Sequence, residues 1–216
     1  MFLQSIKLFK TYLKWKPCNI IYNVSLGRTM CDNGGKNHIV WIDMEMTGLE
    51  VETCHILEIS CVITNSNLKM ISNPLNIVIN QPSSVLNNMN SWCKVQHVKS
   101  KLIEEVRNSK VSLKDAEQIV LKYLENHVPK HTCPMAGNSI YMDRMFLVKY
   151  MPLIHNYLHY RIIDVSSIKE LVRRWNPQIY NSAPPKEVDH RALSDIKESI
   201  RELDYYRKYA FLPHNS

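Results

Sequence analysis

The chain has 216 residues, of which 45% are hydrophobic and 22% are charged. This length and composition fit one globular α/β domain with a terminal extension. No apolar run of about 18 residues is present, so neither a transmembrane helix nor a membrane partner is expected. The formal net charge is +7, but residues 1–31 hold five basic side chains and no acid, which leaves +2 for the remaining 185 residues. So small a charge favours a small ligand or a local, metal-assisted phosphate site over long nucleic acid.

The six cysteines are scattered along the chain, at Cys18, Cys31, Cys54, Cys61, Cys93 and Cys133. None of them forms the C-x-x-C pair that is typical of zinc ribbons and thioredoxin-like redox sites. The pattern instead predicts free, buried thiols in a reducing compartment.

A basic amphipathic segment opens the chain. Apolar residues recur near helical spacing along one side of it, at Phe2, Leu3, Ile6, Phe9 and Leu13. A basic, acid-free helix of this kind is the pattern of a mitochondrial transit peptide; an ordinary surface helix or tail is the alternative. Residues 1–36, which end in a linker-like stretch, are thus a predicted N-terminal extension to a domain at 37–212. A second start at Met30 would give a shorter cytoplasmic or nuclear form.

The first elements of the domain are predicted strands. Residues 39–43 are β-branched and apolar, which suits a buried central strand, and the partly alternating stretch 56–64 predicts a second one. A turn at 65–67 and strands near 68–71 and 75–80 would complete an antiparallel meander.

Helices then alternate with short strands. Ser112 and Asp115 have the spacing of a capping box, which predicts a helix to about Asn126. The other predicted helices cover 84–92, 97–107, 143–151, 166–175 and 192–209. The other predicted strands cover 133–137 and 160–164, and a loop is expected around Pro177, Pro184 and Pro185. This order of elements predicts an α/β fold with a mixed central sheet flanked by helices.

Two carboxylates close the first strand. Asp43 and Glu45 are two residues apart, so in a strand they point to the same face. Like charges so placed raise each other's pKa unless a cation lies between them, and hard oxygen ligands suit Mg²⁺ or Mn²⁺. A solvated strand end is the alternative, and this pair alone is a weak signal.

Two later segments complete the set of reactive groups. Asp143 follows a short predicted strand at the opening of a helix, and His190 precedes the last helix, which carries Asp195 in its first turns. A loop histidine can cover a site whose floor the carboxylates supply.

With these segments in order, the sequence resembles the DEDDh exonucleases, which have a ribonuclease H-like fold, and among them the oligoribonucleases. The matching stretches are WIDMEMTGL, SWCKVQH, AGNSIYMDRMFL, YRIIDVSSIKELVRRW and HRALSDIKESIRELDYY. The resemblance implies a 3′→5′ exoribonuclease that cuts RNA of about two to five nucleotides to 5′-mononucleotides with two divalent ions, Mg²⁺ or Mn²⁺. It makes His190 the general base and four acids the metal ligands: Asp43, Glu45, Asp143 and Asp195. Ser194 replaces a family aspartate, without expected loss of activity.

The resemblance also implies residues that select short single-stranded RNA. Leu49 would wedge between two bases, and Trp92 would stack on one, a contact worth ~1–3 kcal/mol. A cap on the 5′ phosphate would use Ser139, Arg161, Ser166 and Ser167, although Ser166 is equally placed to be a helix N-cap. His97 and Tyr160 match residues that enter the site from the other subunit of a homodimer.

Two further functions share the same acids. One is a DNA-directed or proofreading exonuclease of the same superfamily, against which the segments around Trp92 and at 160–166 argue. The other is a catalytically inactive nucleic-acid-binding homologue, against which the five intact catalytic positions argue.

Overall fold

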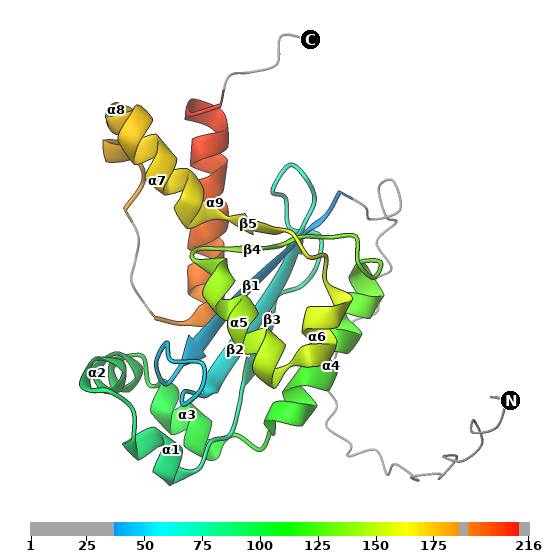
Figure 1. Ribbon diagram of the computed structural model, residues 1–216, viewed down its shortest axis with the longest axis vertical. Coiled ribbons are helices and arrows are strands. Elements are labelled where there is room, and N and C mark those ends of the chain that lie inside the picture. Colours follow the sequence, from blue (N-terminus) through cyan, green and yellow to red (C-terminus); the bar gives the residue numbers. More distant parts are fainter. Residues whose placement is uncertain (1–36, 186–189, 212–216) are drawn as a thin grey trace, which may run out of the picture. The chain divides into compact units, whose positions relative to one another are not determined.

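The computed structural model describes residues 37–185 and 190–211. Their centre is a five-stranded sheet in the order β3-β2-β1-β4-β5 (Figure 1). The strands are β1 (Ile39–Met46), β2 (Ile56–Thr64), β3 (Leu75–Val78), β4 (Met135–Gly137) and β5 (Ile162–Asp164). β1, β2 and β3 pair antiparallel, whereas β4 is parallel to β1 and β5 is parallel to β4. The predicted mixed sheet is therefore confirmed.

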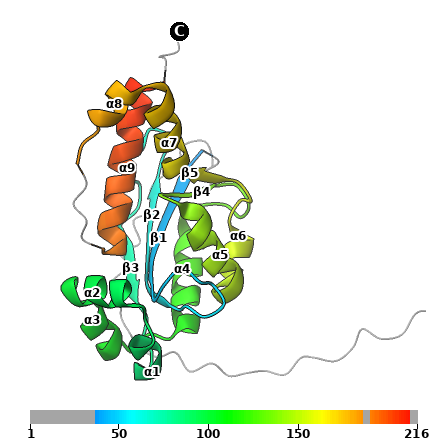
Figure 2. The same ribbon diagram turned by 60° about the vertical axis from the view of Figure 1, so that its left-hand side comes forward.

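The helices surround this sheet. They are α1 (Ser83–Asn87), α2 (Ser91–Lys99), α3 (Leu102–Asn108), α4 (Leu113–His127), α5 (Ile140–Tyr150), α6 (Pro152–Tyr157), α7 (Val165–Trp175), α8 (Pro177–Asn181) and α9 (Ala192–Tyr209). Figure 2 shows the sheet nearly edge-on, with α9 along one face and α4, α5 and α6 along the other. Helices α1, α2 and α3 lie together beyond one end of β1 and β2.

The alternation of side chains along β1 explains the two layers. Val40, Ile42 and Met44 point into the core beneath α4, α5 and α6, while Ile39 and Trp41 point into the core beneath α7 and α9. The indole nitrogen of Trp41 donates a buried hydrogen bond to Thr64 Oγ1 at 3.0 Å. The carboxylates at the end of β1 continue the second series, so they face α9.

The structure corrects several predicted element bounds. Residues 68–71 do not form a strand: only one bridge, Thr64 to Met70, is present there. Leu68 has a positive φ of 64°, and the side chain of Asn65 accepts from the amides of Asn67 and Lys69, so this stretch is a turn.

Other corrections concern helices. The predicted helix 84–92 ends at Asn87 and a new one begins at Ser91, because Asn90 caps it by accepting from the Cys93 amide. The predicted helix 97–107 breaks at Lys101, whose φ is 61°. The first residues of the expected proline loop form a short helix, α8. Helix α6 was not predicted.

Among the described residues, no helix has the length and apolarity needed to cross a bilayer. The predicted extension, residues 1–36, lies outside the described part of the chain, so the domain division stays a prediction.

Candidate active site

The end of β1 presents two carboxylates to one side of the sheet. Asp43 and Glu45 flank Met44, which is buried on the opposite side among the core residues beneath α4 and α5. Glu45 lies opposite Glu58 of β2, and the register of the two strands shifts immediately after this pair. The local rule for strands therefore holds here: residues two apart share a face.

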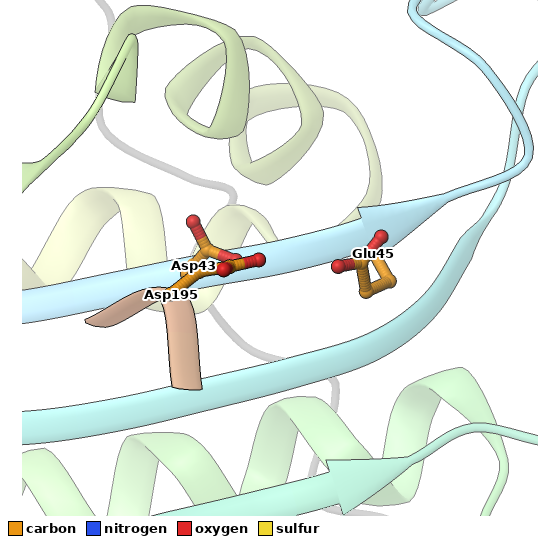
Figure 3. Close-up of side chains that lie close together, drawn as sticks. All are labelled: Asp43, Glu45 and Asp195. Atoms are coloured by element: carbon orange, nitrogen blue, oxygen red, sulfur yellow. The ribbon is translucent and has the colours of Figure 1, made fainter. Parts of the chain in front are cut away.

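Asp195 reaches the same place from α9. One ligand oxygen from each of Asp43, Glu45 and Asp195 can be chosen so that all three atoms lie within 4.8 Å of one another. Figure 3 shows Asp195 at the start of α9, its carboxylate beside that of Asp43, with Glu45 further along β1. Two elements about 150 residues apart in sequence thus supply one cluster of hard oxygen ligands.

Asp143 is the fourth predicted acid, and the first turn of α5 carries it. Its side chain is buried, with 5% exposed. It is not one of the three acids whose oxygens lie within 4.8 Å of one another. A hydrogen bond from the Met44 backbone nevertheless reaches its carboxylate, which places Asp143 beside β1, and the charge of Asp143 is among the causes that raise the pKa of Asp43. The structure therefore brings all four acids to one end of β1.

The carboxylates repel one another in a poorly hydrated place. Burial, followed by the charges of Asp143 and Asp195, raises the pKa of Asp43 well above its usual range. Burial, with the charge of Asp195 next in weight, raises the pKa of Glu45 to about 8. Burial also raises the pKa of Asp143, although hydrogen bonds from backbone amides oppose it. Clustered acids that cannot all ionise alone fit a site built for divalent cations.

His190 precedes α9 in an uncommon backbone conformation. Its φ is 49°, in the left-handed region, and its ring lies edge-on to that of Trp92 with the centroids 5.4 Å apart. Its charge is one of the causes that lower the pKa of His97, the residue that lies 3.8 Å from Glu45. The predicted base and the predicted stacking residue are therefore neighbours.

His97 lies where the sequence did not predict it. Its Nδ1 atom is 3.8 Å from Glu45 Oε2 of the same chain, and its Nε2 atom is hydrogen-bonded to the Met46 carbonyl at 2.9 Å. Burial lowers the pKa of His97, so the ring is neutral at pH 7 and Nε2 carries the proton that Met46 accepts. Only 2% of the residue is exposed. These contacts place His97 beside Glu45 of its own chain, whereas the expectation that it enters a partner's site stays a prediction.

Sequence reasoning missed one acid near the cluster. Glu58 on β2 is fully buried and its charge raises the pKa of both Asp43 and Glu45. The signal was a single glutamate inside the otherwise apolar, buried stretch 56–64, and such a residue needs a partner. Arg191 and Asn76 provide it, with hydrogen bonds of 2.7 and 3.0 Å to Glu58 Oε1.

Two large side chains project from the rim of the site. Leu49 is 67% exposed in the loop after β1, and Trp92 is 60% exposed on the first turn of α2. Neither side chain is therefore packed into the core. Exposed apolar groups beside a polar cluster are suited to contact flat nucleobases.

The serines of the predicted cap meet at the start of α5. Ser166 Oγ accepts from the Ser139 amide at 3.0 Å and donates to Asn138 Oδ1 at 3.1 Å. The N-cap of α7 is Asp164, which accepts from the Ser166 amide at 2.9 Å, so Ser166 is not the cap itself. Ser139 has a φ of 51° and both serine hydroxyls lie within 3.3 Å of each other.

The remaining predicted cap residues are at the surface. Arg161 and Ser167 are exposed, and the guanidinium of Arg161 lies 5.2 Å from the ring centroid of Tyr160. Tyr160 itself is 72% exposed. Arg161 and Tyr160 thus form one exposed pair on the segment that leads into β5. Unlike His97, neither residue is buried in its own chain.

The exonuclease family model RNase_T matches residues 40–203, which is most of the described domain. The fold and the site together define a nuclease domain of the exonuclease class.

Relatives narrow that class. A probable oligoribonuclease of Drosophila melanogaster is 51% identical over 80% of this chain and 82% of its own length. The mitochondrial oligoribonuclease of Homo sapiens is 48% identical over 80% of this chain and 73% of its own, and the oligoribonuclease of Leifsonia xyli is 51% identical over 82% and 85%. The chain belongs to the oligoribonuclease family.

Solved structures with the same fold include exonuclease I, at a TM-score of 0.59 and 12% identity over 80% of this chain. The exonuclease I of Methylocaldum szegediense has a TM-score of 0.59 at 15% identity. This chain spans 41% and 40% of those two structures. The likeness confirms the predicted ribonuclease H-like fold.

Proposed function

We propose that this chain is a 3′→5′ exoribonuclease that hydrolyses short single-stranded RNA, down to dinucleotides, to 5′-mononucleotides. The observation that carries the proposal is the cluster of Asp43, Glu45 and Asp195, whose ligand oxygens can lie within 4.8 Å of one another. The oligoribonuclease relatives, at about half identity over most of the chain, support the class of substrate.

In this proposal the four acids hold two divalent ions, Mg²⁺ or Mn²⁺. When bound, such ions lower the pKa of a water molecule and offset charge on the phosphate. His190 accepts the proton of the attacking water, because an imidazole can exchange a proton near neutral pH. His97, whose ring is held by its hydrogen bond to the Met46 carbonyl, packs within 3.8 Å of the Glu45 carboxylate and restricts the space in which that carboxylate can move.

The rim residues would limit the length of the substrate. Leu49 separates two bases, and Trp92 stacks on the base next to the cut bond, where it also borders His190. Arg161, with the hydroxyls of Ser139, Ser166 and Ser167, binds the 5′ phosphate, since a guanidinium binds phosphate through two parallel hydrogen bonds. A longer RNA would have no free 5′ phosphate at that place.

We further propose a homodimer in which Tyr160 enters the site of the partner. Half-exposed apolar side chains support a contact surface near it: Tyr141, Met145 and Val148 recur on one side of α5, and Leu153 and Ile162 are exposed on the adjoining α6 and β5. An apolar surface of this kind on a folded domain marks a place of association. The 72% exposure of Tyr160 leaves it available to another chain.

We propose a mitochondrial location, with residues 1–36 as the targeting extension and Met30 as a possible start of a cytoplasmic or nuclear form. The basic, acid-free pattern of residues 1–31 supports it, as do relatives in Homo sapiens and Bos taurus named mitochondrial. A fluorescent reporter fused to residues 1–31 should accumulate in mitochondria; a diffuse signal would contradict the proposal.

A time course on 5′-labelled RNA of two to seven nucleotides, with and without Mg²⁺, tests the function. We expect stepwise loss of 3′ nucleotides, fastest for the shortest substrates, and no turnover after chelation. Faster cutting of a 20-nucleotide DNA would indicate a DNA-directed exonuclease instead. A folded chain that binds short RNA without cutting it would indicate an inactive homologue.

A further inference from the structure

The start of α9 is stabilised by a residue from a different element. Arg191, at the N-cap position, has a side chain that does not cap its own helix. The backbone amide of Ala192, the first residue of α9, instead donates a hydrogen bond to Glu58 Oε2 of β2, at 3.0 Å. One of the unsatisfied N–H groups that every helix has at its beginning is therefore satisfied by a carboxylate 134 residues away in sequence.

Arg191 joins the same carboxylate to a second one. Its Nη2 atom is 2.7 Å from Glu58 Oε1 and also 2.7 Å from Glu105 Oε2 on α3, and its Nη1 atom is 2.9 Å from Glu105 Oε1. Glu58 is fully buried, while Glu105 is 44% exposed. A planar guanidinium with charged partners on two sides is fixed in orientation as well as in position. We call these three residues the Arg191 clamp.

The clamp adjoins the proposed general base directly. His190 has a φ of 49°, a left-handed conformation that is strained for a residue other than glycine and persists only where the surrounding structure imposes it. The next residue along the chain is the one that Glu58 and Glu105 hold. Glu58 also lies opposite Glu45 in the β1–β2 register, so the clamp ties the backbone at His190 to the strand pair that carries the acids.

We propose that the Arg191 clamp is a positioning device for His190, and that Glu105 contributes to turnover through it without touching the substrate. This inference rests on the proposed function, since it concerns a residue of that site. Asp195 depends on the clamp less, because α9 also packs along β1 and β2 through Ile196 and Leu203.

A merely stabilising ion pair is the alternative, and partly exposed pairs usually contribute little. The two roles differ in what they affect. A stabilising pair changes the unfolding temperature and leaves the folded enzyme's kcat alone. A positioning pair changes kcat and the mobility of the backbone it holds, with KM unchanged, because substrate binding does not use it.

Glu105→Gln tests the clamp, since it removes one charge from the exposed arm and leaves buried Glu58 paired. Glu104→Gln, the same change on the neighbouring exposed residue of α3, is the matched control. On an RNA dinucleotide with Mg²⁺ we expect kcat of Glu105→Gln to fall about tenfold with KM within about twofold, and the control to match wild type. In a His190→Ala background, Glu105→Gln should have no further effect.

A second readout does not depend on activity. Hydrogen exchange followed by mass spectrometry should show faster exchange over residues 190–199 in Glu105→Gln and not in Glu104→Gln. Unchanged exchange, unchanged kcat, or full additivity with His190→Ala would each overturn the inference. A wild-type chain that cuts no short RNA would refute the proposed function instead, and the exchange data would then still decide whether the clamp holds this backbone.

Discussion

The imidazole of His97 and the carboxylate of Glu45 lie 3.8 Å apart within one chain, although the two residues are 52 positions apart in the sequence. The contact makes His97 part of its own metal-binding cluster. Its ring is neutral and donates to the Met46 carbonyl, which fixes the orientation in which Nδ1 faces Glu45. The relationship predicts that His97 acts in the site of its own chain, whereas Tyr160 acts in the site of the partner.

Replacing His97 by alanine should lower kcat/KM by about 10–100-fold, the usual effect of losing a group that supports a metal ligand. Its place in the site can be tested by mixing two impaired variants, His97→Ala and Asp195→Asn, under conditions that allow subunit exchange, and comparing the activity with that of each variant alone. We expect no recovery, because neither kind of site in a mixed dimer then has both residues. Recovery of activity would mean that His97 acts across the interface after all.

Tyr160 should behave in the opposite way. Tyr160→Ala alone should weaken turnover of a dinucleotide by about tenfold, consistent with loss of one aromatic contact of ~1–3 kcal/mol. Mixed with Asp195→Asn, it should regain activity, because one site of each mixed dimer then has an intact cluster and a partner's tyrosine. Gel filtration with light scattering gives the oligomeric state of each variant. A monomeric wild-type chain would contradict the proposal.

His190→Ala should reduce kcat by ~10²–10⁴, the usual contribution of a positioned general base. Because His190 is not one of the acids that hold the metal, the concentration of Mn²⁺ that gives half-maximal activity should stay within about twofold. Titration of the residual activity with Mn²⁺ measures both quantities. A large change in metal requirement would place His190 among the ligands.

The acids should make the metal-free protein less stable as the pH rises. Glu45 has a pKa of about 8 in the folded chain against an ordinary 4.5, and the pKa values of Asp43 and Asp143 are also raised. A raised pKa means that the protonated form favours folding, so this stability is present below pH ~4.5 and is lost by about pH 8. In chelator, the melting temperature should therefore fall by at least ~5 °C over this range.

Two controls belong to this measurement. Mn²⁺ should restore the melting temperature at pH 8, since an ion that binds only the folded chain stabilises it. Glu45→Gln should flatten the pH dependence of the metal-free protein, because the amide cannot ionise. A melting temperature that rises with pH in chelator would show that repulsion between these carboxylates does not destabilise the metal-free protein.

Arg161→Ala should raise KM for a dinucleotide with a 5′ phosphate by about 10–100-fold, since bidentate, charged hydrogen bonds are lost. For the same dinucleotide without that phosphate, KM should change little. Arg107→Ala, an exposed arginine on α3 outside the site, controls for the change of net charge. Equal effects of Arg161→Ala on both substrates would remove Arg161 from the phosphate cap.

Local rules explain why the acidic cluster was predictable. Asp43 and Glu45 follow strand alternation, and Asp195 stands in the first turn of a strongly patterned helix whose bounds, Ala192–Tyr209, match the prediction. Helix α4 was equally predictable from the sequence, because Ser112 and Asp115 form the predicted capping box. In each case the deciding contacts span only a few residues.

Contacts that the sequence patterns do not show explain the structural predictions that were wrong or missing. Helix α6 was missed because its first turn is capped by Glu117 of α4, which accepts from the Leu153 amide at 2.7 Å. The stretch at 68–71 has strand-forming composition, yet the side chain of Asn65 turns it. Glu58 gave a signal in the sequence, but its partner Arg191 is 133 residues away.

The sequence by itself determined which groups are available for the proposed chemistry, because their types and short spacings are properties of the chain. Only the tertiary structure decided where two of its residues act: His97 is covered by its own chain beside Glu45, and Arg191 is held between β2 and α3. The physical reason is that such contacts depend on how whole layers pack. Segments about 50 to 130 residues apart come into contact only once the sheet has formed, and no local sequence pattern specifies such a contact.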